Sequence, residues 1–274
     1  MSILITGSSG FLGTALSSYF NQKGINCVKL TRQKIEGSIQ VKNYKNIPKA
    51  NTIIHLGQCN DRNFVNNQDH IYLKKNIEIV DQLVNKNFKR FIYISSGSIY
   101  GDKITSPRKV KENITPTDLY SEIKLSSEKL VSESKGIILR LSNIYGPGMS
   151  NKNVLSQIIN KVNLQKEIHL DNGSSIRDFI WLNDVIEAII KVIKSEIIDS
   201  TFNIGSGYGI SINDLIKIVQ STYGTDLPVY FKNTNIPLSS IILDISETIK
   251  ELNWKPKVSI YKGIYSLSRL KNLS

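Results

Sequence analysis

Short apolar runs alternate with segments of helical periodicity through the first half of the chain. The runs of strand length are residues 3–5, 26–30, 52–56, 90–95 and 137–141. Between them, apolar residues recur every three or four positions in residues 11–20, 77–84 and 119–131. Strands without polar alternation are typical of a parallel sheet covered by helices on both faces. The pattern therefore predicts a Rossmann-type, doubly wound α/β domain.

The alternation becomes looser after Gly146-Pro147-Gly148. Apolar spacing predicts helices over residues 154–162 and 184–193 and a short strand over 202–205, and residues 244–252 and 262–270 complete the second part of the chain. Ser211, with Asp214 three residues later, has the pattern of a helix N-cap. We expect a dinucleotide-binding domain of residues 1–147 and 181–206. Residues 148–180 and 207–274 would form a smaller, mixed C-terminal lobe.

A glycine-rich turn directly follows the first predicted strand. Its glycines, Gly7, Gly10 and Gly13, have the spacing G-x-x-G-x-x-G between a strand and a helix. Glycines let the backbone turn sharply and approach a pyrophosphate, and the N–H groups of a helix N-terminus attract that anion. A plain strand-to-helix turn is the alternative, but this position and its flanks favour binding of a nicotinamide dinucleotide.

The residues after the second predicted strand bear on the choice of cofactor. An acidic residue about 20 positions beyond such a turn binds the ribose 2′-hydroxyl of NAD. Here Thr31-Arg32 follows the strand, and the nearest acid, Glu36, lies later in the loop. A guanidinium suits a 2′-phosphate, so the sequence favours NADP. NAD is the alternative, with Arg32 then an ordinary solvated residue.

Tyr120 and Lys124 lie one turn apart on the same face of a predicted helix. A nearby ammonium lowers the pKa of a phenol from about 10, so the phenol can exchange a proton with a carbinol oxygen. The spacing alone is not specific, because Tyr19 and Lys23 share it. Tyr120, however, follows a strand that ends at Ser95-Ser96, where a hydroxyl can bind the same substrate oxygen.

These motifs resemble the extended short-chain dehydrogenases, the NAD(P)-dependent epimerases, dehydratases and reductases of nucleotide sugars. The matching segments keep the family's order and are residues 6–13, 95–101, 120–124, 140–148, 177–181, 184–185, 202–207 and 252–256. The resemblance covers essentially the whole chain. It implies that Tyr120 is the catalytic acid/base, that Lys124 tunes it and holds the nicotinamide ribose, and that Ser96 binds the substrate hydroxyl.

The resemblance also implies the residues that bind the ligands. Those expected at the cofactor are Gly7, Ser9, Gly10, Phe11, Leu12, Gly13, Arg32, Leu56, Gly57, Gln58, Asn76, Tyr120, Lys124 and Ile144. Those expected at a nucleotide-diphosphate sugar are Ser96, Ser98, Asn143 and Arg177, with the C-terminal lobe as the substrate lobe. A guanidinium suits a diphosphate because it grips two oxygens at once. Without the resemblance, Arg177-Asp178 would be read as a surface ion pair and Asn143 as a turn residue.

Departures from the family narrow the activity. Gly97-Ser98 stands where the family's dehydratases carry an Asp-Glu pair, which disfavours a 4,6-dehydratase. The Cys and His groups of its combined epimerase–reductases have no counterpart, and residues 32–51 compress a full strand–helix unit. This short form is most similar to 4-keto-sugar reductases of bacterial surface-polysaccharide synthesis. We expect an NADPH-dependent reductase of a nucleotide-linked 4-keto-(6-deoxy) sugar. An NAD-retaining nucleotide-sugar 4-epimerase and a non-catalytic NADP-binding regulatory module are the alternatives.

Composition adds mainly exclusions. The 274 residues carry a formal net charge of +12, but the basic residues are scattered Lys without aromatic interleaving, so no nucleic-acid partner is expected. His55, His70 and His169 lack metal-ligand spacing, and no metal is expected. Cys27 and Cys59 form no CxxC pair, and neither a secretory signal nor a bilayer-spanning run is visible. A cytoplasmic protein without membrane contact is expected.

The family resemblance implies a homodimer formed through residues 77–84 and 119–131.

Overall fold

The chain forms two compact units in the computed structural model, which describes residues 2–232 and 238–271. Unit 1 comprises Met1–Gly101, Val110–Leu141 and Ala188–Asn203, and unit 2 comprises Asp102–Lys109, Ser142–Glu187 and Ile204–Ser274. The bounds differ from those expected from the sequence, because residues 102–109, 142–147, 181–187 and 204–206 belong to unit 2. The ligand-binding roles expected for the two parts stay predictions.

Unit 1 is built on a seven-stranded sheet in the order β10-β6-β5-β4-β1-β2-β3. These strands are β1 (Ile3–Thr6), β2 (Cys27–Thr31), β3 (Ile39–Gln40), β4 (Thr52–His55), β5 (Arg90–Ser96), β6 (Ile137–Leu141) and β10 (Ser200–Ile204). Strand β1 pairs in parallel with both β2 and β4, so the glycine-rich turn leaves the sheet near its middle. The predicted doubly wound parallel sheet is confirmed.

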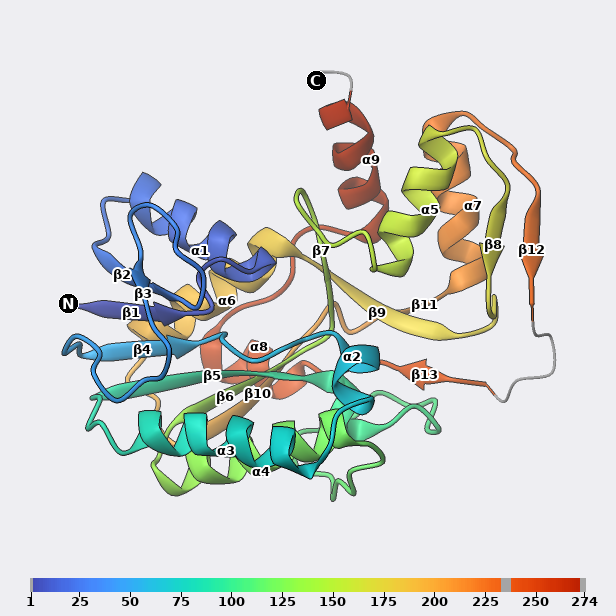
Figure 1. Cartoon of the computed structure of the whole chain (residues 1–274). Helices are drawn as coiled ribbons and strands as arrows, with labels where there is room; N and C mark the ends of the chain where they lie inside the picture. The colour runs from blue at the N-terminus through green and yellow to red at the C-terminus, as the bar shows by residue number, and fades with distance from the viewer. Residues whose placement is uncertain (1, 233–237, 272–274) are drawn as a thin grey trace. The chain divides into compact units, whose positions relative to one another are not determined.

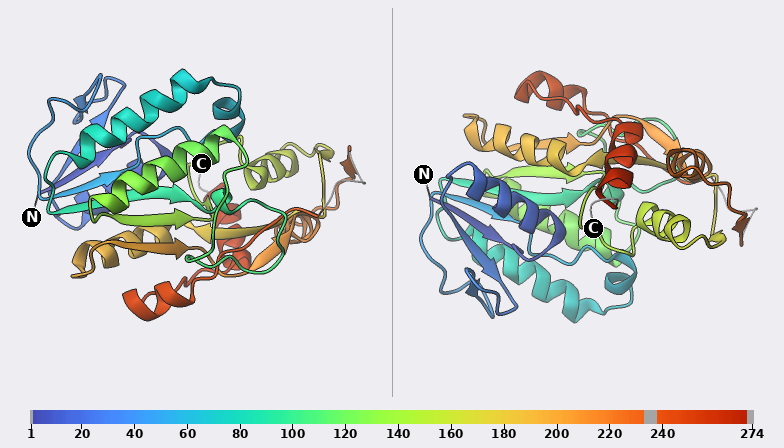
Figure 2. Two further views of the ribbon diagram at one scale, coloured as in Figure 1. Left: turned by 90° about the horizontal axis from the view of Figure 1, so that it is seen from below. Right: turned by 90° about the horizontal axis from the view of Figure 1, so that it is seen from above.

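Helices cover both faces of this sheet, as Figures 1 and 2 show. α3 (His70–Val84) and α4 (Leu119–Glu133) pack together on one face. α1 (Phe11–Gln22) covers the other face with the second half of α6 (Leu182–Lys194). Arg90 fastens the end of α6 by donating to the carbonyls of Val192, Ser195 and Ile197. The helices on each face thus bury the apolar side chains of the strands.

Two local features of unit 1 bear on the sequence predictions. α3 begins seven residues before the predicted start, because the Asp69 side chain accepts from the Tyr72 N–H and caps the helix there. Between β2 and β4 the chain forms only the two-residue β3 and no helix. The predicted compression of residues 32–51 is therefore confirmed.

Unit 2 combines a small mixed sheet with four helices that lie wholly within it in the described part of the chain. β7 (Asn143–Tyr145), β9 (Ile176–Trp181), β11 (Gly209–Ser211) and β13 (Ser240–Ile241) form a four-stranded sheet, and β8 (Ile168–Leu170) pairs with β12 (Val229–Phe231). The helices are α5 (Val154–Asn163), α7 (Ile212–Tyr223), α8 (Ser246–Leu252) and α9 (Ile260–Lys271). Ser211 caps α7 by accepting from the Asp214 N–H at 3.0 Å, as predicted.

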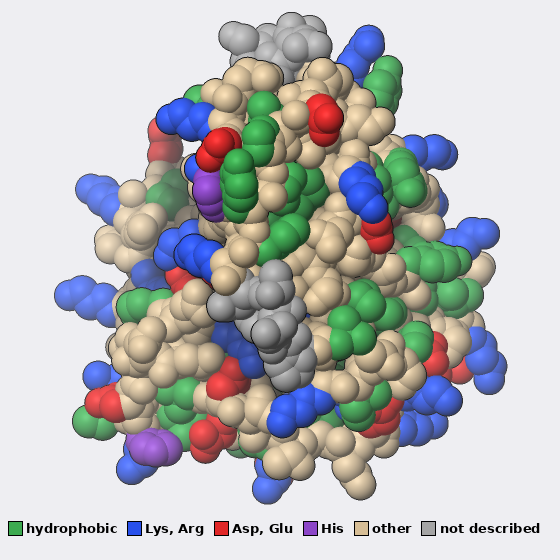
Figure 3. Space-filling view, turned by 90° about the vertical axis from the view of Figure 1, so that its right-hand side faces the viewer, with side chains coloured by type: hydrophobic (Ala, Val, Ile, Leu, Met, Phe, Trp, Pro, Cys, Tyr) green, Lys and Arg blue, Asp and Glu red, His purple; other side chains and the backbone are tan. Residues whose placement is uncertain are grey.

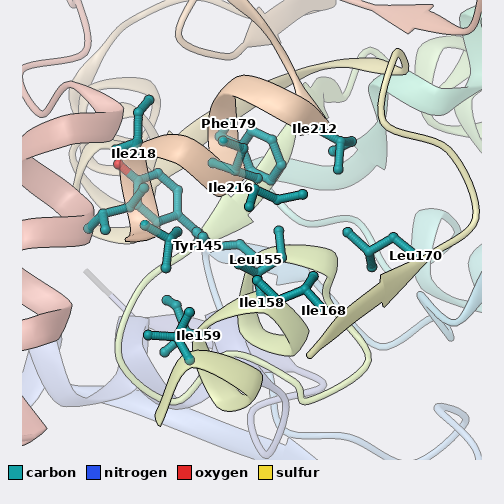
Figure 4. Close-up of a cluster of buried hydrophobic side chains, with 14 of the residues drawn as sticks. Tyr145, Leu155, Ile158, Ile159, Ile168, Leu170, Phe179, Ile212, Ile216 and Ile218 are labelled. Carbon is teal, nitrogen blue, oxygen red and sulfur yellow. The ribbon is translucent and has the colours of Figure 1, made fainter. Parts of the chain in front are cut away.

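The core of unit 2 lies between its sheet and the helices α5, α7 and α9 (Figure 4). Tyr145 is fully buried there, with its ring centroid 5.2 Å from that of Trp181 and 6.3 Å from that of Phe179. α9 comes close to this ring at Gly263, where any side chain would collide with the Tyr145 phenol. Unit 2 thus has an apolar core of its own.

On the face in Figure 3 the exposed basic side chains form no single patch, and several stand beside Asp or Glu. Among the described residues, no helix has both the length and the apolar character to span a bilayer.

Candidate active site

The glycine-rich turn closes tightly against the end of β4. Gly7 has φ +65°, and a Cβ atom there would lie 2.7 Å from the carbonyl carbon and oxygen of Leu56. A Cβ atom at Gly13 would collide with the Gly7 carbonyl oxygen. Position 7 therefore requires glycine because of its positive φ and because a side chain has no space there. Position 13 requires glycine because a side chain has no space.

The N-terminus of α1 faces this turn without a capping side chain. Gly10 is the N-cap residue, and no side chain accepts a hydrogen bond from the first turn of the helix. Helix N–H groups in this state bind anions, and the helix dipole adds to the attraction. The turn and α1 consequently fit the pyrophosphate of a dinucleotide, and the expected roles of Phe11, Leu12 and Gly13 there stay predictions.

The end of β2 lies beside the turn. Ser9 Oγ and Thr31 Oγ1 are 3.2 Å apart, and Arg32 follows with an exposed side chain. Burial raises the pKa of Tyr44, and a hydrogen bond with Thr6 and the charge of Arg32 oppose that rise. Arg32 is therefore exposed directly after β2, whose end lies beside the glycine turn.

His55 ends β4 as a buried, structural histidine. Its Nδ1 lies 2.6 Å from Thr6 Oγ1, which also accepts from the Leu56 N–H at 3.2 Å. Its ring stacks on Tyr93 with centroids 5.9 Å apart. Burial, aided by the charge of Lys124, lowers the pKa of His55 to about 3. The neutral ring thus joins β1 to β4 directly beneath the turn.

Further residues expected at the cofactor follow β4 or lie on α3. Gln58 is fixed by its side chain, which donates to Ser127 Oγ at 2.9 Å and accepts from the Tyr93 hydroxyl at 2.5 Å. Asn76 is buried on α3 and donates to the Tyr72 carbonyl at 2.9 Å. Except for Ile144, every residue expected to bind the cofactor lies in unit 1; Ile144 lies on β7 in unit 2.

Ser96, Tyr120 and Lys124 come together in unit 1. Ser96 is the last residue of β5, and the other two lie in the first turns of α4. The Ser96 side chain lies close enough to the Tyr120 phenol to lower its pKa. Lys124 Nζ lies 5.9 Å from the Tyr120 ring centroid and 5.2 Å from that of Tyr93, and it donates to the Ile94 carbonyl at 3.2 Å. This arrangement can exchange a proton with one substrate oxygen.

The pKa of Tyr120 differs from what the sequence predicts. Burial raises the pKa of Tyr120, whereas the sequence predicted a lowered value. The nearby Ser96 side chain and the charge of Arg62 oppose the rise, but the loss of solvation outweighs them. Burial also lowers the pKa of Lys124 to about 8. The phenol is consequently protonated at neutral pH.

A short helix that the sequence did not predict fixes the start of α4. It is α2 (Arg62–Asn66), and Arg62 pairs with Asp118 at 2.5 Å. Asn66 donates to the same carboxylate at 3.0 Å and accepts from the Tyr120 N–H at 2.9 Å. Asp118 also caps α4 through the Ser121 N–H. Asp118 three residues before Ser121 is a capping signal in the sequence, but nothing there indicates its pairing with α2.

Ser98 lies beside Ser96, with their hydroxyl oxygens 2.9 Å apart at the start of η1 (Gly97–Tyr100). The Ser98 N–H also donates to Ser96 Oγ at 3.2 Å. These hydrogen bonds therefore fix the orientation of the Ser96 hydroxyl. Residues 97 and 98 are Gly and Ser, so neither supplies a carboxylate.

The residues expected to bind the diphosphate lie in unit 2. Asn143 donates from Nδ2 to the Asp178 carbonyl at 3.0 Å. The Arg177 guanidinium donates to the carbonyl of Ser239 at 3.0 Å and to its hydroxyl at 2.8 Å. Asp178 is fully buried and accepts from the Ser206 N–H, so the alternative of a surface ion pair at Arg177-Asp178 is wrong.

The described residues contain no group of three or more His, Cys, Asp or Glu side chains arranged to hold a metal ion.

Known proteins are similar to this chain in both sequence and fold. A model of the NAD dependent epimerase/dehydratase family matches residues 3–205. A dTDP-4-dehydro-6-deoxyglucose reductase of Escherichia coli is 26% identical, covering 97% of this chain and 96% of its own. A putative UDP-glucose 4-epimerase of Methanocaldococcus jannaschii is 28% identical, covering 96% and 95%. The UDP-glucose 4-epimerase of Thermotoga maritima, solved with UDP-glucose, is 22% identical with a TM-score of 0.87 over 100% of both chains. Other structures of this fold contain NAD or NADPH.

Proposed function

Because this chain belongs to the NAD-dependent epimerase/dehydratase family, we propose that it is an NADPH-dependent reductase of a nucleotide-linked 4-keto-(6-deoxy) sugar. Its product would serve bacterial surface-polysaccharide synthesis. The E. coli relative, by its name, reduces a sugar of this class. The proposal concerns the direction of the reaction, the cofactor and the substrate, which the family alone leaves open.

The observation that carries the proposal is the grouping of Ser96 at the end of β5 with Tyr120 and Lys124 in the first turns of α4. Reduction of a ketone places negative charge on the carbonyl oxygen, and an acid must supply a proton there. Burial raises the pKa of Tyr120 and so keeps that proton in place. Ser96 stands beside the phenol and can donate a hydrogen bond to the same oxygen. Bound NADPH would supply the hydride.

The cofactor would be held by residues of unit 1. The glycine turn and the N-terminus of α1 would bind the pyrophosphate. The Lys124 ammonium would donate to the nicotinamide ribose, and Arg32 would pair with the 2′-phosphate. Because Arg32 is exposed and follows β2 directly, its guanidinium is available for this role.

The nucleotide diphosphate would be bound in unit 2 by Asn143 and Arg177. The Arg177 guanidinium is already oriented by Ser239, whose hydroxyl donates to Asp102 at 2.6 Å. An oriented guanidinium loses little freedom when it binds a phosphate.

Elimination of water is disfavoured on chemical grounds. It needs an acid and a base beside the tyrosine, and residues 97 and 98 are Gly and Ser. A 4-epimerase is the second candidate, because the M. jannaschii relative is a putative UDP-glucose 4-epimerase and the same three residues would serve it. An epimerase must first remove the proton of the sugar hydroxyl, so Tyr120 would have to act as a phenolate before it acts as an acid.

A NADPH-oxidation screen tests the proposal. The protein is mixed with 4-keto sugars carried on CDP, dTDP, GDP or UDP, and NADPH is followed by its absorbance. We expect one of them to consume one NADPH per product. Purification with bound NAD, together with sugar interconversion and no NADPH consumption, would show an epimerase instead.

The Tyr120→Phe variant serves as the control and addresses the non-catalytic alternative. It should bind NADPH as the wild type does but lose turnover. A protein that binds NADPH and has no activity to lose would be a binding module.

A further inference from the structure

A buried ion pair lies behind Tyr120 and Lys124 in unit 1. Glu128 of α4 and Arg140 of β6 are 5% and 8% exposed, with Arg140 Nη2 lying 2.6 Å from Glu128 Oε2. Arg140 Nε donates to both carboxylate oxygens, at 3.1 and 3.2 Å. The Ser95 hydroxyl donates to Oε1 at 2.5 Å. These donors hold the Glu128 side chain in one orientation.

The network continues from Arg140 through unit 1. Its Nη1 donates to the Tyr100 hydroxyl at 2.7 Å and to the Val110 carbonyl at 3.0 Å. The Tyr100 hydroxyl donates in turn to Asn203 Oδ1 at 2.9 Å. Arg140 is therefore satisfied from several elements, and the pair avoids the large cost of an unpaired buried charge.

Lys124 lies one helical turn before Glu128 on the same side of α4. Its ammonium is buried between the rings of Tyr93 and Tyr120, and the Ile94 carbonyl accepts one of its three N–H bonds. Isolation from water favours the neutral amine, which could neither stabilise a phenolate nor donate from all three positions. An opposite charge nearby would keep this lysine protonated.

We infer that Glu128 is a positioning residue that keeps Lys124 protonated beside Tyr120. Glu128 acts through Lys124 and touches no reacting atom, and its role in turnover rests on the proposed function. The opposite charge of Glu128 raises the pKa of Lys124 against the lowering by burial. Arg140 and Ser95 fix the carboxylate so that this effect is constant.

Other groups face Lys124 from neighbouring elements. His55 on β4 is neutral at working pH, and the phenols of Tyr93 and Tyr120 both have raised pKa values. Cys59, after β4, also raises the pKa of Lys124, but less than Glu128 does. Glu128 is thus the strongest of these opposing influences.

The titration of Lys124 tests the inference directly. Protein labelled with ¹³C at the lysine Cε is titrated without cofactor, and Lys124→Arg identifies the resonance of Lys124. Glu128→Gln should lower the midpoint of this resonance by about one pH unit, as removal of a nearby opposite charge does. Glu133→Gln removes an exposed charge from the end of the same helix and should leave the midpoint unchanged.

A second variant covers the case in which an unpaired Arg140 prevents folding. Glu128→Gln with Arg140→Met removes both charges together, a change that buried pairs often tolerate. It should also lower the midpoint of Lys124. An unchanged midpoint in both folded variants would overturn the inference, since a merely structural pair would leave the titration where it was.

The kinetic consequence separates this inference from the proposed function. In the NADPH assay, the alkaline fall of kcat/KM should move to lower pH by the same amount in Glu128→Gln. A protein without reductase activity would refute the proposed function while the shift of the Lys124 resonance still decided the role of Glu128.

Discussion

Replacement of His55 by Phe should remove a large part of the acid sensitivity of unit 1. His55 is 1% exposed and is neutral in the folded protein, where burial lowers its pKa to about 3. In the unfolded chain the imidazole regains a pKa of about 6.5. Between these two values the unfolded state binds more protons, so acid favours unfolding. The stability that this histidine contributes is present above pH 6.5 and is lost as the pH falls toward 3.

The size of the effect follows from the two pKa values. Over the full range the difference amounts to about 5 kcal/mol in the free energy of unfolding, and about 2 kcal/mol of it is lost between pH 8 and pH 5. Phe keeps an aromatic ring against Tyr93 but cannot titrate. It also loses the contact with Thr6, which costs about 1 kcal/mol at every pH.

Urea unfolding at pH 8 and pH 5, followed by circular dichroism, measures these free energies. We expect His55→Phe to be less stable than the wild type at pH 8 and to lose about 2 kcal/mol less on going to pH 5. His70→Gln, which changes an exposed histidine at the start of α3, should follow the wild type at both pH values. Parallel pH dependence of His55→Phe and the wild type would refute the assignment of a neutral, buried His55.

Three other substitutions test the site. Tyr120→Phe should lower kcat by about 10²- to 10⁴-fold in the NADPH assay, because the proton donor is lost, and should leave the Kd for NADPH within about twofold. Arg32→Gln should raise the Kd for NADPH about tenfold or more and leave that for NADH unchanged, as titration by fluorescence would show; equal effects on both would place Arg32 away from the 2′-phosphate. Gly7→Ala should cost about 2–3 kcal/mol in urea unfolding and abolish NADPH binding, because both its φ of +65° and the nearby Leu56 carbonyl oppose a side chain. Gly24→Ala has the same φ but open space and should cost only about 1 kcal/mol, so equal losses would contradict the close approach at Gly7.

The sheet of unit 1 was predictable because its strands are buried on both faces. β1, β4 and β6 are buried along their whole length, and such strands leave predominantly apolar runs in the sequence. The strands of unit 2 left no such signal. β7, β11 and β13 have two or three residues each, and their pairing depends on β9, which is distant in sequence. Such strands depend on long-range pairing that local periodicity does not encode.

The candidate site shows the same division between local and distant information. The glycine turn and the Tyr120–Lys124 pair are local patterns, so the sequence could place them. The contact of Asn66 with the Tyr120 N–H joins residues 54 positions apart. The burial of Tyr120 could not be predicted from the sequence either, and it reversed the expected direction of the shift in the Tyr120 pKa.

The most direct test of the proposed reductase is the fate of the hydride. The protein is given NADPH carrying deuterium at the transferable C4 position and a 4-keto nucleotide sugar that it consumes. We expect one deuterium at C4 of the sugar product and one NADP⁺ released per product, with both formed at least about 10²-fold more slowly by Tyr120→Phe. A product free of deuterium, formed without net oxidation of NADPH, would contradict the account.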